Sequence, residues 1–232
     1  MGVVGVSTGL PELSLLETRV LGVLVEKERT VPDTYPLSLN ALAAGCNQKN
    51  NRDPLLQATE AEVQAAVDAL RPLSLVIESS GSRVMRYAHN LGRVLNLTDP
   101  AVALLAALML RGPQTPGELR INSERLHRFA DLGAVEAALQ ALAARTEADG
   151  GPLAVQLPKA PGSREHRWAH LLSGAVEAAA PPRAGGEAEA APPDLPAAEI
   201  ATLKAQVARL AAETAELRAL VERLYRNLGA GK

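Results

Sequence analysis

The chain has 232 residues, of which 24 are basic and 26 acidic, so that its formal net charge is -2 at pH 7. This balance excludes a cationic field over the whole molecule, and any contact with nucleic acid must come from a local group of cations. Hydrophobic residues make up 47% of the chain but aromatic residues only 2%, so Leu, Val and Ala must form the core. This composition favours helices over a large sheet.

The residue types that support catalysis or metal binding are rare in this chain. The single cysteine, Cys46, excludes an internal disulfide and a multi-cysteine metal site, and it favours a cytoplasmic location. His166 and His170 have no third ligand nearby in sequence, and no Gly-rich phosphate loop occurs. The longest apolar run, residues 101–110, is about half the length of a membrane-spanning helix. We therefore expect a non-catalytic protein with no cofactor, no metal and no membrane segment.

Two parts of the sequence resemble each other. Residues 81–91 match residues 162–172 at Gly, Ser, both Arg, Ala, His and the last Leu, and similar apolar patterns precede both segments. This similarity predicts two copies of one structural unit, followed by a tail.

Capping residues and apolar spacing predict three helices and one β-hairpin in each copy. In the first copy the predicted helices cover about 14–27, 38–46 and 59–71, and the hairpin covers 75–89. In the second copy Asp99 is the expected N-cap of a helix that ends near 110, Thr115 begins another helix, Asp131 caps a third that ends near 145, and the hairpin covers 153–170. Three helices and a hairpin are typical of a winged-helix domain, a helix-turn-helix variant.

The predicted fold class is mainly α with small β-hairpins. We expect a flexible N-terminus (1–12), a first winged-helix domain (13–96), a second winged-helix domain (97–174), a disordered linker (175–197) and a coiled-coil helix (198–229). The linker prediction depends on a composition rich in Ala, Pro, Gly and Glu with no apolar period.

The C-terminal segment carries an unbroken heptad pattern of apolar residues. Its seam consists of Ile200, Leu203, Val207, Leu210, Thr214, Leu217, Val221, Leu224 and Leu228. The a positions are β-branched and the d positions are Leu up to Leu224, a combination that favours a two-stranded parallel coil. The sequence therefore predicts a parallel homodimer, and the alternative is a helix that folds back on its own domains.

A polar run and several hairpin arginines are the predicted nucleic-acid contacts, because amides and cations bind base edges and phosphates. These residues are Asn47, Gln48, Lys49, Asn50, Arg52, Arg83, Arg86, Arg164 and Arg167. In the alternative interpretation the amides close turns, and Lys49 and Arg52 pair with nearby carboxylates. We expect the hairpin aromatic and histidine residues to pack into the domains; they are Tyr87, His89, Trp168 and His170.

The third helix of each copy argues against ordinary DNA reading. Instead of Arg or Lys, these helices offer carboxylates, which phosphates repel, at Glu60, Asp68 and Glu136. A second hypothesis follows, in which the protein is an adaptor that binds another protein through its acidic third helices and makes no direct contact with DNA.

Several runs within about 15–174 are distinctive, and they lie at 19–22, 35–40, 46–52, 110–119, 157–158 and 170–174. In these runs the sequence resembles the YceH-like family of uncharacterised bacterial proteins. Val31 departs from the usual threonine, and Ile121-Asn122 replaces a polar and a basic residue, which weakens a DNA contact there. The resemblance implies a tandem winged-helix fold, with no established reaction or ligand.

Overall fold

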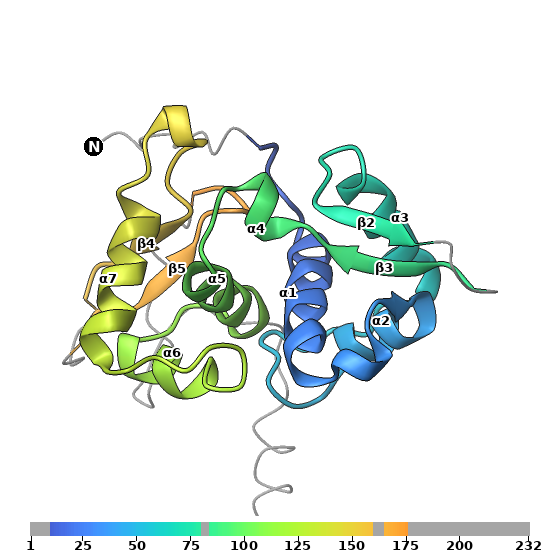
Figure 1. Cartoon of the computed structure of the whole chain (residues 1–232), viewed down its shortest axis with the longest axis horizontal. Coiled ribbons are helices and arrows are strands. Elements are labelled where there is room, and N and C mark those ends of the chain that lie inside the picture. The colour runs from blue at the N-terminus through green and yellow to red at the C-terminus, as the bar shows by residue number, and fades with distance from the viewer. Residues whose placement is uncertain (1–9, 80–83, 160–164, 176–232) are drawn as a thin grey trace, which may run out of the picture. The chain divides into compact units, whose positions relative to one another are not determined.

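The computed structural model describes residues 10–79, 84–159 and 165–175. The chain divides into two compact units, Met1–Pro182 and Arg183–Lys232. The predicted coiled-coil positions, nearly all of the predicted linker, and the hairpin-turn residues Arg83 and Arg164 lie outside the described residues. Among the described residues the protein is mainly helical, with seven α-helices and two small antiparallel sheets (Figure 1).

The elements follow the predicted order in both halves. The first half contains α1 (Leu15–Thr30), a short 3-10 helix (Pro32–Thr34), β1 (Leu37–Ser38), α2 (Leu39–Cys46), α3 (Glu60–Leu70), β2 (Val76–Ser79), β3 (Arg86–His89) and, after its hairpin, the short α4 (Leu91–Val94). The second half contains α5 (Asp99–Arg111), α6 (Pro116–Asn122), α7 (Leu132–Ala143), a 3-10 helix (Glu147–Asp149), β4 (Ala154–Gln156) and β5 (Trp168–His170). The helix α4, the strand β1 and both 3-10 helices were not expected from the sequence.

Capping residues set the helix starts. Ser14 and Thr59 each form a complete capping box, as expected from their glutamates three residues later. Thr115 does the same for α6, and Asp131 caps α7. The expectation for Asp99 is wrong by one residue, because Thr98 has the extended backbone of an N-cap and Asp99 is already helical.

Each half carries a small sheet built around its last strand. In the first half the strand order is β1-β3-β2, and Leu37 pairs with Tyr87. In the second half β4 pairs with β5, and an isolated bridge joins Gln114 to Trp168. This bridge takes the place of the β1–β3 pairing, so the two halves share one arrangement of strands.

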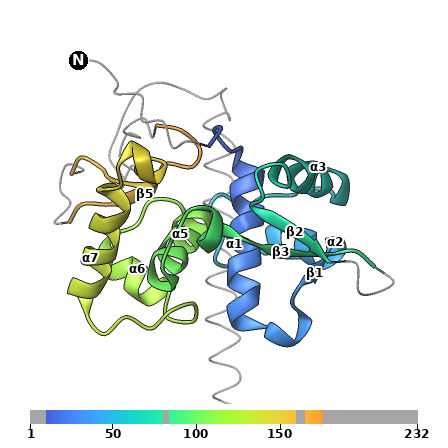
Figure 2. The same ribbon diagram turned by 45° about the horizontal axis from the view of Figure 1, so that its top comes forward.

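The first helices of the two halves, α1 and α5, pack directly against each other (Figures 1 and 2). Ten consecutive residues of α5, 101–110, are buried because its neighbours enclose it. At Gly22 the helices approach so closely that an added Cβ would lie 2.9 Å from Cγ of Leu110. Backbone hydrogen bonds also join the halves, from Leu13 N–H to the Leu172 carbonyl and from Asp53 N–H to the Leu110 carbonyl.

The hairpin aromatic residues pack into the core, as expected. Tyr87 and Trp168 are buried, and the Tyr87 hydroxyl donates to Oε1 of Gln64 at 2.9 Å. His89 Nε2 lies 2.9 Å from Oε2 of Glu28.

Of the described helices, none combines the length and the apolar character that crossing a membrane requires.

Candidate functional site

The polar loop, residues 47–52, was the first predicted nucleic-acid contact, and in the structure its arginine is buried inside the fold. Arg52 has a fully buried side chain that forms an ion pair with Glu26, with Nη2 2.6 Å from Oε2. Its Nε donates to the Gly45 carbonyl at 3.1 Å. The Arg52 guanidinium is therefore paired with a carboxylate, as in the alternative interpretation, and its contact with nucleic acid stays a prediction.

The side-chain amides of Asn47 and Gln48 in the polar loop form hydrogen bonds within the protein. Asn47 donates to the Ala58 carbonyl and accepts from the Ala58 N–H, both at 2.7 Å. Gln48 accepts from Nζ of Lys27 at 3.3 Å and donates to the Asn50 carbonyl. Lys49 and Asn50 are exposed, and neither side chain makes a hydrogen bond or ion pair with another described residue. Of the predicted contacts in this loop, these two face solvent.

A buried arginine, Arg19, which was not among the predicted site residues, binds the backbone on both sides of this loop. Arg19 on α1 is fully buried and donates to the carbonyls of Cys46 and Pro54, at 3.3 and 2.7 Å. Burial and the nearby charge of Arg52 lower the pKa of Arg19. Its signal was a cation within the otherwise apolar run of a helix, where a charged side chain needs partners from another segment.

The hairpin arginines Arg86 and Arg167 occupy equivalent positions in the two halves, and each donates a hydrogen bond to an equivalent backbone carbonyl. Arg86 donates to the Pro36 carbonyl at 2.7 Å, and Arg167 donates to the Pro113 carbonyl at the same distance. Each acceptor lies two residues before the N-cap of the second helix of its half. Arg167 also pairs with Glu118 at 3.0 Å. These hydrogen bonds join the hairpin of each half to the start of its second helix, and a contact of the two arginines with nucleic acid stays a prediction.

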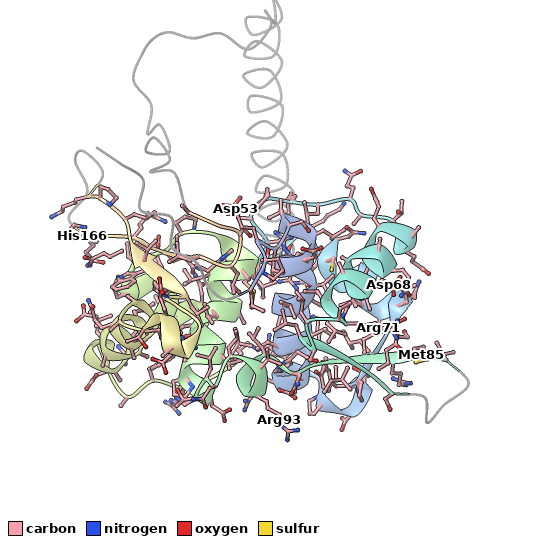
Figure 3. All side chains as sticks on the ribbon, turned by 90° about the horizontal axis from the view of Figure 1, so that it is seen from above. Asp53, Asp68, Arg71, Met85, Arg93 and His166 are labelled. Carbon is pink, nitrogen blue, oxygen red and sulfur yellow. The ribbon has the colours of Figure 1, made fainter. Side chains whose placement is uncertain are left out.

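The third helix of the first half, α3, presents carboxylates to solvent. Glu60 and Asp68 are exposed, and Glu60 accepts from Nδ2 of Asn40 at 2.8 Å. Asp68 accepts from Nε2 of Gln64 at 2.9 Å and lies 3.5 Å from Arg71 (Figure 3). Backbone and side-chain hydrogen bonds from Thr59 lower the pKa of Glu62, so this exposed carboxylate stays charged. The outward face of α3 is therefore acidic.

The third helix of the second half, α7, has a less charged face. Glu136 is exposed and makes no hydrogen bond or ion pair with another described residue, and Leu132 is 39% exposed. Both line a cleft of about 220 Å³ beside α7, together with Pro116, Gln156, Glu165 and His166. This cleft combines two carboxylates with two apolar side chains.

Basic side chains gather on α6 and on the connection that follows it. Arg120, Arg125 and Arg128 are exposed, and Arg125 and Arg128 make no hydrogen bond or ion pair within the described part of the chain. Arg120 donates a long hydrogen bond, 3.4 Å, to the Ala130 carbonyl. This basic segment was not among the predicted contacts, although three arginines within nine residues indicate a local positive charge.

The described residues offer little for nucleophilic or metal chemistry. Cys46 is buried, and burial raises the pKa of its thiol to about 12, although Arg19 and Arg52 act in the opposite direction. A thiol with such a pKa does not form the reactive thiolate at neutral pH. No group of three or more His, Cys, Asp or Glu side chains within the described ranges could hold a metal ion.

The described residues define a mainly helical protein made of two similar halves, each with a small antiparallel sheet. The family model described as "Protein of unknown function, DUF480" matches residues 13–163, and the chain belongs to this family. The expected membership of an uncharacterised bacterial family is therefore confirmed.

Similar proteins from Burkholderia match nearly the whole chain. UPF0502 proteins of Burkholderia ambifaria (strain MC40-6) and Burkholderia orbicola (strain MC0-3) are 55% and 56% identical over 222 residues, which cover 95% of this chain and 91% of each relative. A UPF0502 protein of Burkholderia pseudomallei (strain 668) is 56% identical over 220 residues, with the same shares covered.

Proposed function

We propose that the protein is a non-catalytic, cytoplasmic adaptor in which two tandem winged-helix domains bind another protein through their third helices. The order of elements supports the winged-helix assignment. In the first half it is helix, strand, two helices and a hairpin, and the strand β1 completes a three-stranded sheet with the hairpin. This is the winged form of a helix-turn-helix. The Gln114–Trp168 bridge supports the same assignment for the second half.

The single observation that carries the adaptor proposal is the outward face of the third helices. Neither Glu60–Leu70 nor Leu132–Ala143 contains a Lys or an Arg. Their exposed positions are Glu60, Ala61, Glu62, Ala65, Asp68 and Ala69 on α3, and Leu132, Gly133, Glu136, Ala137, Gln140 and Ala141 on α7. A helix that enters a DNA groove meets phosphates on both sides, which repel carboxylates. Small side chains between carboxylates instead suit close packing against another protein.

The charge on these faces defines the chemistry of the partner. Three carboxylates on α3 favour a partner surface that carries Lys or Arg, with apolar side chains that cover the alanines. Complementary charges raise the association rate and set orientation more than they raise affinity. We therefore expect binding that weakens when salt is added but does not disappear.

Charge reversal on the third helices tests this proposal. The full-length tagged protein is purified from its own cells with nuclease present, and bound proteins are quantified by mass spectrometry. The triple variant Glu60→Arg, Asp68→Arg, Glu136→Arg should lose a defined set of partners. Its thermal unfolding should stay close to that of the wild type, because exposed charges on helices contribute little to stability.

A matched control separates the third helices from general surface charge. The variant Asp33→Arg, Glu124→Arg, Glu147→Arg makes the same change in net charge at three exposed positions elsewhere. It should retain the partners. Recovery of the same bound proteins with the wild type, the third-helix variant and the control variant would contradict the adaptor proposal.

Nucleic-acid binding is the second candidate function, and the basic segment is the observation that favours it. Lys49, Arg125 and Arg128 are exposed cations that are not used in ion pairs among the described residues. Affinity for DNA would come from phosphate neutralisation and fall steeply with salt. Fluorescence anisotropy with a labelled duplex at several salt concentrations tests it. This function would be favoured if the wild type binds and the variant with all three residues changed to Glu does not. A wild type that does not bind at low salt would rule it out.

A further inference from the structure

A polar cleft of about 360 Å³ lies where the two halves meet, at the contact of α1 with α5. Its walls come from the end of α1, the polar loop, α5, and α6 with the residues after it. The lining includes Lys27, Val31, Asn51, Arg111, Ile121 and Arg125. Cavities of this size take small molecules, and they occur preferentially between domains.

Positive charge exceeds negative charge in this junction cleft. Lys27, Arg111 and Arg125 line it, and Glu26 is the only carboxylate among its lining residues in the described part of the chain. Glu26 is already engaged, because both of its oxygens accept from Arg52 and its Oε2 also lies 3.3 Å from Nζ of Lys27. Arg111 and Arg125 have no ion pair with a described carboxylate, so an anion in the cleft would be stabilised.

The position of Arg111 is fixed by the polar loop. Its Nη2 donates to Oδ1 of Asn51 at 2.5 Å, and Asn51 has the left-handed backbone, φ 60°, that asparagine tolerates better than most residues. Burial lowers the pKa of Arg111, and Arg52 lowers it further, although Glu26 acts in the opposite direction. The guanidinium is thus held in place next to another cation, an arrangement that a bound anion relieves.

Arg125 also lines the cleft, and it makes no hydrogen bond or ion pair with another described residue. The lining has an apolar part as well, because it includes Val31, which is 40% exposed, and Ile121, which is 74% exposed. A molecule that fits both features carries an anionic head for the arginines and an apolar body for Val31 and Ile121.

We propose that the junction cleft binds a small organic anion, with its phosphate or carboxylate group on Arg111, Arg125 and Lys27 and its apolar part against Val31 and Ile121. The ligand contacts both halves of the protein. This inference does not depend on the adaptor proposal, since neither third helix lines the cleft.

Isothermal titration calorimetry of the full chain at low ionic strength tests the proposal with four probes. These are phenyl phosphate, phenylacetate, inorganic phosphate and benzyl alcohol. The aromatic anion with the preferred head group should bind with one-to-one stoichiometry. Inorganic phosphate should bind more weakly because it lacks the apolar part, and benzyl alcohol should bind more weakly because it lacks the charge. The comparison of phenyl phosphate with phenylacetate identifies the head group.

The variant Arg125→Ala should weaken binding of the better aromatic anion about tenfold, the expected loss for one hydrogen bond to a charged group. It should still fold, because Arg125 is exposed and makes no hydrogen bond or ion pair with another described residue. The matched control is Arg128→Ala, which removes an exposed cation three residues away that does not line the cleft. It should leave the affinity unchanged.

Three outcomes would overturn the proposal. The first is a wild type that binds neither aromatic anion. The second is equal weakening by Arg125→Ala and Arg128→Ala, which would mean nonspecific attraction to surface charge. The third is equal affinity for benzyl alcohol, which would mean that the cations play no part.

Discussion

Arg52 and Glu26 form a bidentate ion pair, with Nη2 2.6 Å from Oε2 and Nη1 3.2 Å from Oε1. The pair joins the polar loop to α1 beneath the junction cleft. Two N–H groups of the planar guanidinium donate to the two carboxylate oxygens, and this bidentate geometry satisfies a buried arginine best.

Replacement of Arg52 by Met should destabilise the protein by about 3 kcal/mol, because the largely buried Glu26 would lose its bidentate partner and keep only Lys27, at 3.3 Å. Urea denaturation at pH 7 measures this loss. The control is Lys49→Met in the same loop, where the side chain is exposed and the free energy of unfolding should hardly change. Equal effects of the two substitutions would contradict the role given to Arg52.

The stability provided by Glu26 should depend on pH. Burial raises the pKa of Glu26, but the hydrogen bond and the charge of Arg52 outweigh burial and hold the pKa below its usual 4.5. A carboxylate with a depressed native pKa stabilises the fold above its unfolded pKa, and the contribution is lost as pH falls through the native pKa. Glu26→Gln should therefore be less stable than the wild type at pH 7, and the gap should close in acid. A gap that is the same at pH 7 and at pH 3 would refute this assignment.

His170 should control stability in a different pH window. Burial lowers the pKa of His170 to about 4 from 6.5, and its Nδ1 is enclosed with no hydrogen-bond partner in the described structure. Below pH 6.5 the unfolded chain takes up a proton that the native state resists, so stability falls as pH drops toward 4. We expect a loss of about 1 to 2 kcal/mol between pH 7 and pH 5.

Urea denaturation at these two pH values measures the His170 effect. The variant His170→Gln should flatten the dependence, whereas His166→Gln, at an exposed hairpin histidine, should keep it. If both variants keep the slope, another group is responsible for it.

The crossing of α1 and α5 should tolerate no side chain at Gly22. A Cβ there would lie 2.9 Å from Cγ of Leu110 and 3.3 Å from Cβ of Met109, so the helices would have to shift. Gly22→Ala should cost about 1 to 3 kcal/mol through overpacking. Gly117→Ala is the control, since the nearest atom to its Cβ would be 3.9 Å away, and it should be neutral or slightly stabilising. Thermal unfolding of the two variants gives the comparison.

The C-terminal heptads should make the protein a parallel homodimer. Light scattering at several concentrations compares the full chain with a chain that ends at Gly174, and only the full chain should approach twice its monomer mass. Thr214→Ile should strengthen the dimer, because it places an apolar β-branched residue at an a position. Monomer mass for both chains at high concentration would rule out this dimer.

The sequence predicted the helices and hairpins well because their signals are local. The capping boxes at Ser14 and Thr59 and the alternation around Tyr87 depend on residues a few positions apart. The elements it missed depend on distant partners. The strand β1 has only two residues and exists because Leu37 and Ser38 pair with Tyr87 and Arg86, nearly fifty positions later.

The site was predicted less well for the same reason. A cation between polar residues looks like a binding residue until its partner is known, and Arg52 finds Glu26 twenty-six positions away, across the packing of the polar loop on α1. Arg86 and Arg167 likewise bind carbonyls about fifty positions earlier. The carboxylates of the third helices were placed correctly because the helical period alone determines which side of an amphipathic helix faces solvent.

The enclosure of α5 has a consequence for how the duplicated halves can be used. A helix with ten consecutive buried residues has no side left for solvent, and part of what covers it belongs to the other half. Cutting the chain between the repeats would expose that apolar surface on both fragments. Neither repeat can therefore be used as a separate domain. Their two outward faces are presented together, and a partner that touches both gains avidity without the entropic cost of a flexible tether.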